Sequence, residues 1–411
     1  MRLSLRPGVG MPMRRPIPIA ASIVAVSMAA TVAAALGASP RPTPAAPPAP
    51  ICADSELPAW ARTSSRLGDG MPDPAGRIVF GPETRMDDIF GEVVSLYAID
   101  PDGSDLVRLL DCETMRPRFS PDGSRLAFGI AMDDGSIQVA TMAVDGTDLR
   151  ILTSTPGYAE QPDWSPDGSW IIYAHAPMHC PDPDCAIPGG YHESLWRMDI
   201  DGTGQRPIDG PSRLDGDPAS LPAITQDIEP RFSPDGTEVV FDRSDGPDYR
   251  TTPMIRDLAT GAERPATGNL RKEMHADWSR DGRSIIYNTD TPRADGSYFE
   301  QVERVPADDP TAEPVVLYPA DADHLGYKPT YSPDGTSIAF LCEGRLCTMD
   351  ADGSNVRVLV QPGRWDATLN HVAWGIVPKA PTGSASRTWP RRTSVALGST
   401  SRQLLRTWSI R

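Results

Sequence analysis

The stretch Phe119-Ser120-Pro121-Asp122-Gly123 decides the fold, because close copies of it return along the chain. Each complete copy joins an aromatic residue to Ser-Pro-Asp-Gly or a near variant, and successive aromatic residues lie 43 to 68 positions apart. Self-similarity at such a period indicates an array of structural units, since one unit cannot bury its apolar face alone. The further copies occupy residues 164–168, 232–236, 278–282 (with Arg in place of Pro) and 331–335, and a worn sixth lies at Trp374-Gly375.

The chemistry of the repeat predicts its local structure. Pro presets φ for a turn, Asp accepts hydrogen bonds from the nearby backbone, and Gly adopts a positive φ. A short apolar strand follows each complete copy, and most units then have a second hairpin with Asp-Gly at its tip, which is a strong hairpin signal. Each unit is therefore expected to be a four-stranded antiparallel blade, and six units predict an all-β, six-bladed β-propeller. The apolar strands end in Phe128, Tyr173, Phe241, Tyr287 and Phe340.

The two ends of the repeat region are expected to complete one blade together. The sixth copy, at Trp374, lacks the strand that should follow it. A matching strand, Arg77-Ile78-Val79-Phe80, stands near the other end, after a Pro-Ala-Gly turn. Pairing of these segments would remove an open sheet edge that is otherwise prone to aggregation.

The Ser-Pro-Asp-Gly turns, their flanking aromatic residues and the Asp-Gly hairpins resemble the WD40-like PD40 repeat of TolB-type propellers. The resemblance covers about residues 77–378. Similar repeats occur in propeller domains of prolyl-oligopeptidase-like enzymes and in some polysaccharide lyases. TolB itself carries a small α/β domain before its propeller, for which residues 51–76 are too short, so its role in the envelope division machinery is not implied.

The segments outside the repeats predict export. Residues 1–38 combine four Arg with an almost wholly apolar stretch at 17–38, which is typical of a signal peptide and is also long enough for an N-terminal membrane anchor or tether. Residues 39–50 form a Pro-rich linker, and residues 51–76 form an N-terminal extension. Residues 379–411 are basic, lack the repeat and are expected to be disordered. The expected location is periplasmic, extracellular or membrane-anchored on the outer face.

The charge of the chain bears on its partners. The formal net charge is −16, and because both terminal segments are basic, residues 51–378 carry −28. Such an acidic domain repels nucleic acid, so no nucleic-acid partner is expected. The expected partner is a protein or a component of the cell envelope, and the expected oligomeric state is a monomer.

Six cysteines in an exported chain predict disulfides. Cys342 and Cys347 flank a tight hairpin, Cys180 and Cys185 flank Pro-Asp-Pro-Asp, and Cys52 and Cys112 remain to attach the N-terminal extension to the first blade. The alternative is zinc, for which His175 lies near the second pair. The weak metal candidates are His179, Cys180, Cys185 and His192.

No catalytic residues are predicted. The chain contains no Gly-x-Ser-x-Gly nucleophile elbow, so a peptidase of the propeller type is not expected. The repeated Asp residues are turn residues rather than general acids. Asp100-Pro-Asp102-Gly-Ser-Asp105 resembles part of a calcium loop but lacks its final Glu. No cofactor is expected.

One set of polar residues remains as a candidate binding site. Each lies three positions before a repeat aromatic, so together they are expected to form a ring near one mouth of the axial channel. As a binding site, the ring is expected to take an anionic or metal-bridged ligand, or the terminus of a partner inserted into the channel. A water-filled channel also requires polar walls, so a purely structural role is the alternative. The predicted function is a non-enzymatic binding module, with a carbohydrate-active lyase or hydrolase that uses the channel mouth as the alternative. The ring consists of Arg116, Gln161, Glu229, His275, Lys328 and His371.

Overall fold

The structure is a computed structural model in which the chain divides into two units, Met1–Pro47 and Pro48–Arg411. The described residues all belong to the second unit, and their regular elements are all β-strands. No helix in this part of the chain is long and apolar enough to cross a membrane. The described residues are 48–52, 76–82, 95–176, 193–208, 225–245, 250–268, 272–292, 298–319, 325–361 and 369–377.

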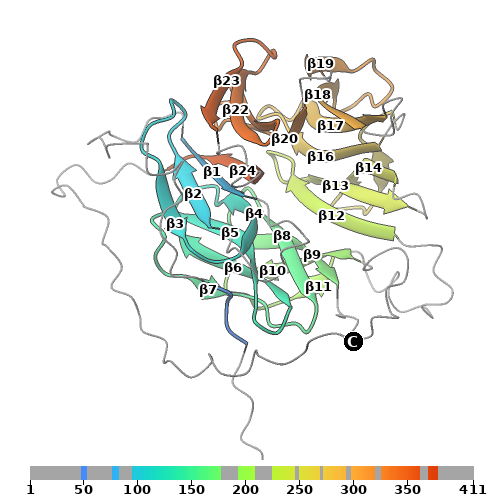
Figure 1. Cartoon of the computed structure of the whole chain (residues 1–411). Coiled ribbons are helices and arrows are strands. Elements are labelled where there is room, and N and C mark those ends of the chain that lie inside the picture. The colour runs from blue at the N-terminus through green and yellow to red at the C-terminus, as the bar shows by residue number, and fades with distance from the viewer. Residues whose placement is uncertain are drawn as a thin grey trace, which may run out of the picture. The chain divides into compact units, whose positions relative to one another are not determined.

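Antiparallel sheets of four strands make up most of the fold (Figure 1). The closing sheet has the order β24 (Leu369–Gly375), β1 (Arg77–Pro82), β2 (Leu96–Ile99) and β3 (Val107–Leu110). Three further sheets follow sequence order. They are β12 (Thr225–Phe232), β13 (Glu238–Asp245), β14 (Arg250–Asp257) and β15 (Glu263–Pro265); β16 (Lys272–Trp278), β17 (Ser284–Pro292), β18 (Tyr298–Pro306) and β19 (Val315–Tyr318); and β20 (Gly326–Tyr331), β21 (Ser337–Cys342), β22 (Arg345–Asp350) and β23 (Arg357–Val360).

The remaining strands form one eight-stranded sheet, in which a single parallel pair, Ile137 with Tyr158, joins two antiparallel halves. The first strand of each repeat contacts the first strand of the next, from β4 through β8, β12, β16 and β20 to β24 and back to β4. The sheets are therefore arranged as a propeller, while the count of six blades stays a prediction. The halves of the eight-stranded sheet are β4 (Thr114–Phe119), β5 (Arg125–Ala131), β6 (Ile137–Ala143) and β7 (Arg150–Ile151), and β8 (Tyr158–Trp164), β9 (Trp170–Ala176), β10 (Ser194–Asp199) and β11 (Arg206–Pro207).

The predicted pairing of the two ends of the repeat region is confirmed. β1 and β24 pair antiparallel, with Ile78 opposite Trp374 and Phe80 opposite Val372. The glycine that follows Trp374 has a packing reason, because a Cβ atom on Gly375 would lie 2.1 Å from Cγ of Phe119. The sixth copy therefore has Gly where the other copies have Ser, since the aromatic ring of β4 occupies the space of a side chain.

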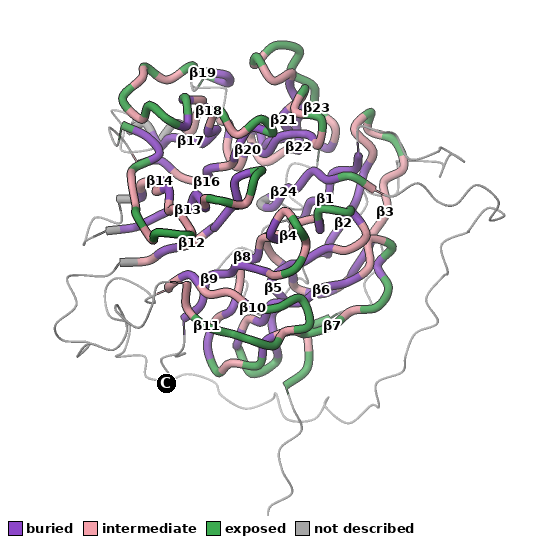
Figure 2. The backbone as a smooth tube through the Cα atoms, turned by 180° about the vertical axis from the view of Figure 1, so that it is seen from behind, coloured by how far each residue is buried: buried purple, intermediate pink, exposed green. Residues whose placement is uncertain are grey.

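The aromatic residues of the repeat form the centre of the core, but they do not end their strands as predicted: each strand continues for at least two residues beyond its aromatic residue. The side chains are 0–1% exposed and rank among the largest fully buried side chains of the described residues. Burial of one such ring removes roughly 150–250 Å² of surface from water, which makes these positions leading contributors to stability. Figure 2 shows the buried segments along the strands and the exposed segments mainly at the hairpin turns. The six equivalent residues are Phe80, Phe128, Tyr173, Phe241, Tyr287 and Phe340.

The repeated Asp residues are turn residues, as predicted. Asp167 Oδ1, for example, accepts a hydrogen bond from Ser165 Oγ at 2.6 Å and one from the Ser169 backbone N–H at 3.0 Å. These bonds lower the pKa of Asp167 to about 2. In the calcium-like stretch, Arg77 bonds both Asp100 (2.8 Å) and Asp105 (2.9 Å), so an arginine is already the counter-charge of those carboxylates.

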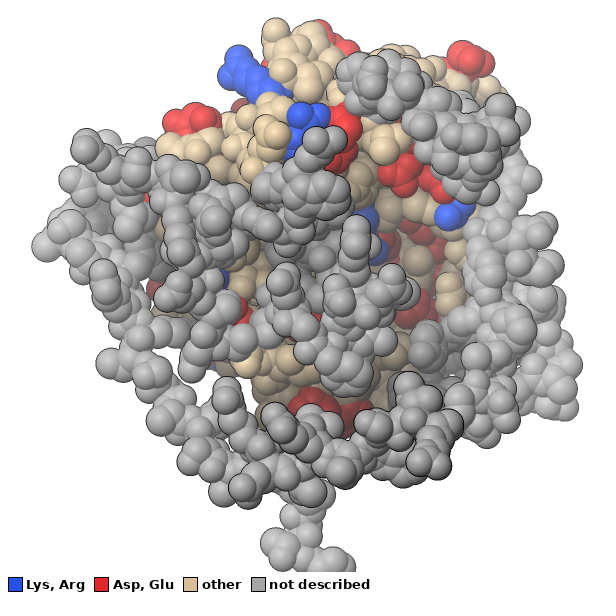
Figure 3. Space-filling model, viewed as in Figure 1, with Lys and Arg blue, Asp and Glu red and all other residues tan. Residues whose placement is uncertain are grey.

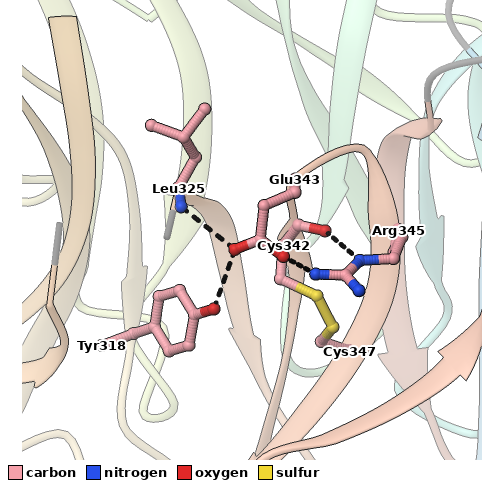
Figure 4. The surroundings of a disulfide bond; sticks show 6 residues. All are labelled: Tyr318, Leu325, Cys342, Glu343, Arg345 and Cys347. Atoms are coloured by element: carbon pink, nitrogen blue, oxygen red, sulfur yellow. Dashed lines mark hydrogen bonds and ion pairs between the residues drawn. A yellow bond between two sulfur atoms is a disulfide. The ribbon is translucent and has the colours of Figure 1, made fainter. Parts of the chain in front are cut away.

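Two of the three predicted disulfides lie in the described residues. Cys52–Cys112 connects the N-terminal extension to the segment between β3 and β4, next to a backbone hydrogen bond from Ile51 to the Ala131 carbonyl. Cys342–Cys347 spans the hairpin between β21 and β22 (Figure 4). Cys180 and Cys185 lie outside the described residues.

Hydrogen bonds surround the Cys342–Cys347 hairpin. Figure 4 shows Glu343 Oε1 accepting from the Tyr318 hydroxyl (2.9 Å) and from the Leu325 N–H (3.1 Å), while the Arg345 guanidinium contacts the second carboxylate oxygen. The carboxylate thus ties this hairpin to the preceding sheet.

Candidate functional site

A shared backbone irregularity positions five of the six ring residues. The ladder between the first and second strands of five repeats shifts register at the ring residue, which marks a β-bulge. Each of these residues has a left-handed backbone, although none is glycine. A Cβ atom makes that conformation cost roughly 1–2 kcal/mol. The φ angles are 53° for Arg116, 57° for Gln161, 53° for Glu229, 58° for His275 and 53° for Lys328.

Proline is compatible with the interrupted ladder at four of these positions. It directly follows Arg116, Gln161, Glu229 and Lys328, and it lacks the N–H that a regular ladder needs. Within sheets, proline is therefore confined to edges, first positions and bulges. The sixth ring residue differs. Val follows His371, and His371 has no positive φ; it pairs with Gly81, and the register of this ladder shifts between His371 and Leu369.

The ring residues do come together, as their spacing predicts. One pocket, which is partly open to solvent, is lined by Arg116, Glu229, His275, Lys328 and His371. Gln161 is adjacent, and its Oε1 accepts the Glu229 backbone N–H at 2.8 Å.

Glu229 contacts three basic side chains of the pocket. Its side chain is 4% exposed; one oxygen contacts Arg116 Nη1 and lies 3.2 Å from His275 Nε2, and the other lies 3.7 Å from Arg231 Nη2. Burial acts to raise the pKa of Glu229, but the charges of Arg116 and His275 outweigh it and bring the pKa well below its ordinary range. Glu229 is therefore ionised at neutral pH, and its charge is matched within the pocket.

Two imidazoles line the pocket in different settings. Burial lowers the pKa of His275, whose Nδ1 lies 2.8 Å from Asn288 Oδ1, so both of its ring nitrogens have partners. Burial lowers the pKa of His371 still further, and the neighbouring charges of Lys328 and Arg116 act in the same direction. His371 is 8% exposed, and its Nδ1 has no hydrogen-bond partner among the described residues.

A second layer of charged residues lies two positions after the ring, and sequence reasoning missed it. Arg118, Arg231 and Asp277 line the same pocket. Asp163, the equivalent residue of β8, accepts the Phe232 backbone N–H at 2.9 Å, and burial raises its pKa to about 7. The signal was available, because side chains two apart on a strand project to the same face.

The predicted metal site can be compared with the structure only for the described residues. Among the residues that the structure describes, no group of three or more His, Cys, Asp or Glu is placed to hold a metal ion. His175 Nδ1 hydrogen-bonds the Tyr158 carbonyl at 2.9 Å. The candidates His179, Cys180, Cys185 and His192 lie outside the described residues.

Known structures share this fold. TolB of Acinetobacter baumannii superposes with a TM-score of 0.55 and 20% identity, over 75% of this chain and 69% of that one. The chain has a TolB-like β-propeller fold. Hydrazine synthase of Kuenenia stuttgartiensis also superposes, with a TM-score of 0.55 and 16% identity, over 75% of this chain and 48% of that one. Identities this low establish the fold alone.

Comparison of sequences gives a match over a much shorter stretch of the chain. The uncharacterized peptidase YuxL of Bacillus subtilis (strain 168) is 41% identical over 56 residues, which is 14% of this chain and 8% of that relative. The chain thus matches only a small part of the relative's length. No protein-family model matches the chain.

Proposed function

We propose that this TolB-like propeller is an exported, non-enzymatic binding module that uses the ring pocket to hold a protein or a component of the cell envelope. The observation that carries the proposal is the left-handed backbone shared by five non-glycine ring residues. Backbone strain of this kind persists where the surrounding structure imposes it, and it clusters at functional sites. Here it directs polar side chains of different repeats toward one pocket.

Export is part of the proposal. Its support is the apolar segment at residues 17–38, which follows basic residues, together with the disulfides Cys52–Cys112 and Cys342–Cys347. Disulfides persist in oxidising compartments, and a periplasmic, extracellular or membrane-anchored location on the outer face accounts for both features.

Capture of a partner from the cell envelope tests the proposal. The tagged full chain serves as bait against solubilised envelope, beside Lys328→Gln and the control Arg357→Gln, which changes an exposed residue of the outer strand β23. We expect one partner to be retained by the wild type and the control but not by Lys328→Gln. A partner that all three retain equally would place binding outside the pocket and contradict the proposal.

A second assay tests whether the protein is instead a carbohydrate-active enzyme. The same three proteins are incubated with a panel of acidic polysaccharides, with and without divalent metal. Release of unsaturated sugars that absorb in the near ultraviolet, lost in Lys328→Gln, would replace the binding module with a lyase.

A further inference from the structure

We infer that the ring pocket binds the carboxylate group of its ligand, a conclusion that rests on the proposed binding function and names its chemistry. The first support is charge. Four basic and two acidic side chains line the pocket, which leaves a surplus of two positive charges in a chain of net charge −16. The basic residues are Arg116, Arg118, Arg231 and Lys328, and the acidic ones are Glu229 and Asp277.

Carboxyl groups behind the pocket offset this surplus less than exposed carboxylates would. Burial raises the pKa of each of these groups, so that each retains its proton to a higher pH than an exposed carboxyl. Glu229, which is fully ionised, is already matched by Arg116 and His275. The groups behind the pocket are Asp163, Asp242, Glu160 and Glu193.

The chain as a whole has the opposite character, with a formal net charge of −16. On the face shown in Figure 3, carboxylates are dispersed over the described part of the molecule and basic side chains are sparse. The basic pocket is therefore a local feature. An acidic surface repels anions in general, so an anion must gain specific contacts to enter.

Buried polar atoms that lack protein partners are the second, independent support. His371 Nδ1 and Arg231 Nε are both buried, neither has a hydrogen-bond partner among the described residues, and both residues line the pocket. Leaving such a group unpaired is unfavourable. A ligand oxygen can accept from Arg231 Nε, and from His371 Nδ1 in the tautomer that carries the ring proton on this atom.

These features favour an anion over a metal ion. A divalent cation would lie among four basic side chains, and one of the two imidazoles, His275, already has partners on both nitrogens. A carboxylate matches the pocket in charge, and its two oxygens can accept from guanidinium, ammonium and imidazole donors together. The carboxylate can belong to a small free acid or to the C-terminus of a partner chain.

Calorimetry on the full chain tests this inference. The probes are succinate, an acetylated tripeptide with a free C-terminal carboxylate, and the same tripeptide with a C-terminal amide. We expect binding of at least one carboxylate probe and none of the amide. Binding of the tripeptide acid alone would identify a chain end as the source, and binding of succinate alone would identify a small acid.

Matched variants locate the contact. Because a hydrogen bond to a charged group contributes about 1.5–3 kcal/mol, Lys328→Gln and His371→Leu should each weaken carboxylate binding by about tenfold or more. His371→Asn retains a polar atom near the position of Nδ1 and should recover part of the affinity, and Arg357→Gln should leave it unchanged. Thermal unfolding of each variant shows that it is folded.

The outcomes separate the inference from the proposed function. Equal binding of acid and amide, tighter binding of Zn²⁺ or Ca²⁺ than of any carboxylate, or binding that both Lys328→Gln and His371→Leu retain would overturn the inference. Envelope capture that depends on Lys328, with no carboxylate binding in the wild type, would overturn the inference and leave the binding module intact.

Discussion

Glycine should stabilise the protein relative to alanine at Lys328 and destabilise it at His371. The two residues occupy equivalent ring positions, but Lys328 has a φ of 53° and His371 is not among the residues of positive φ. Lys328→Gly and Lys328→Ala both remove the side chain beyond Cβ. The difference in stability between these two variants therefore reports the effect of the Cβ atom on the backbone, because both variants lack the contacts of the lysine side chain.

The expected magnitude follows from two opposing contributions at Lys328. Removal of the Cβ atom relieves roughly 1–2 kcal/mol of left-handed strain. Glycine also gives the unfolded chain more freedom, which costs about 0.4–1 kcal/mol. The free energy of unfolding of Lys328→Gly should therefore exceed that of Lys328→Ala by about 0.5–1 kcal/mol. At His371 no strain is relieved, so alanine should be better by about 0.5–1 kcal/mol.

Urea unfolding of the four variants measures both differences. The midpoint should be higher for Lys328→Gly than for Lys328→Ala and lower for His371→Gly than for His371→Ala, with a common m value. The reasoning fails if alanine is the more stabilising residue at both positions, because the backbone of Lys328 would then not be strained.

Further predictions concern packing, disulfides and pH. Gly375→Ser, which restores the repeat, should lower the free energy of unfolding by about 1–3 kcal/mol, because the new side chain meets the ring of Phe119; an unchanged urea midpoint would contradict this. Replacing Cys52 and Cys112 by Ser should cost about 4 kcal/mol, against about 2 kcal/mol for Cys342 and Cys347, because the bonds close loops of 60 and 5 residues; calorimetric unfolding of the two double variants gives the order. Burial raises the pKa of Asp163 to about 7 from 3.8, so the stability associated with its proton is fully present below pH 4 and lost as the pH rises through 7. The free energy of unfolding of Asp163→Asn, relative to that of the wild type, should therefore rise by up to about 4 kcal/mol between pH 4 and pH 8. A difference in urea midpoint between the two proteins that is the same at pH 4 and at pH 8 would disprove it.

Local chemistry made much of the fold predictable. The Ser-Pro-Asp-Gly turns form from hydrogen bonds within five residues, and the Asp-Gly hairpins need only a positive φ at glycine. The pairing of β1 with β24 is long-range, yet it was predicted because the sixth repeat lacked one strand and the first segment offered it.

Partners of individual side chains were not predictable in the same way. Glu229 contacts both Arg116 and His275. This arrangement depends on how three repeats face one another. Sequence spacing places these residues at equivalent heights but does not say which one becomes buried. The raised pKa of Asp163 was also not predictable, since it comes from burial, which the pattern of a single strand does not reveal.

The bulges depend both on the local sequence and on contacts between neighbouring repeats. Proline after four ring residues could have predicted the irregular ladders, because it cannot donate to a neighbouring strand. His275 has the same bulge and the same left-handed backbone with Ala276 after it, so proline is not required for the conformation. His275 N–H instead donates to Asp242 at 2.6 Å, as Glu229 N–H donates to Gln161 and Lys328 N–H to Asn288 at 3.2 Å. The amide freed by each of these bulges is thus satisfied by a side chain of the preceding repeat, which couples the geometry of the pocket to the contact between neighbouring repeats.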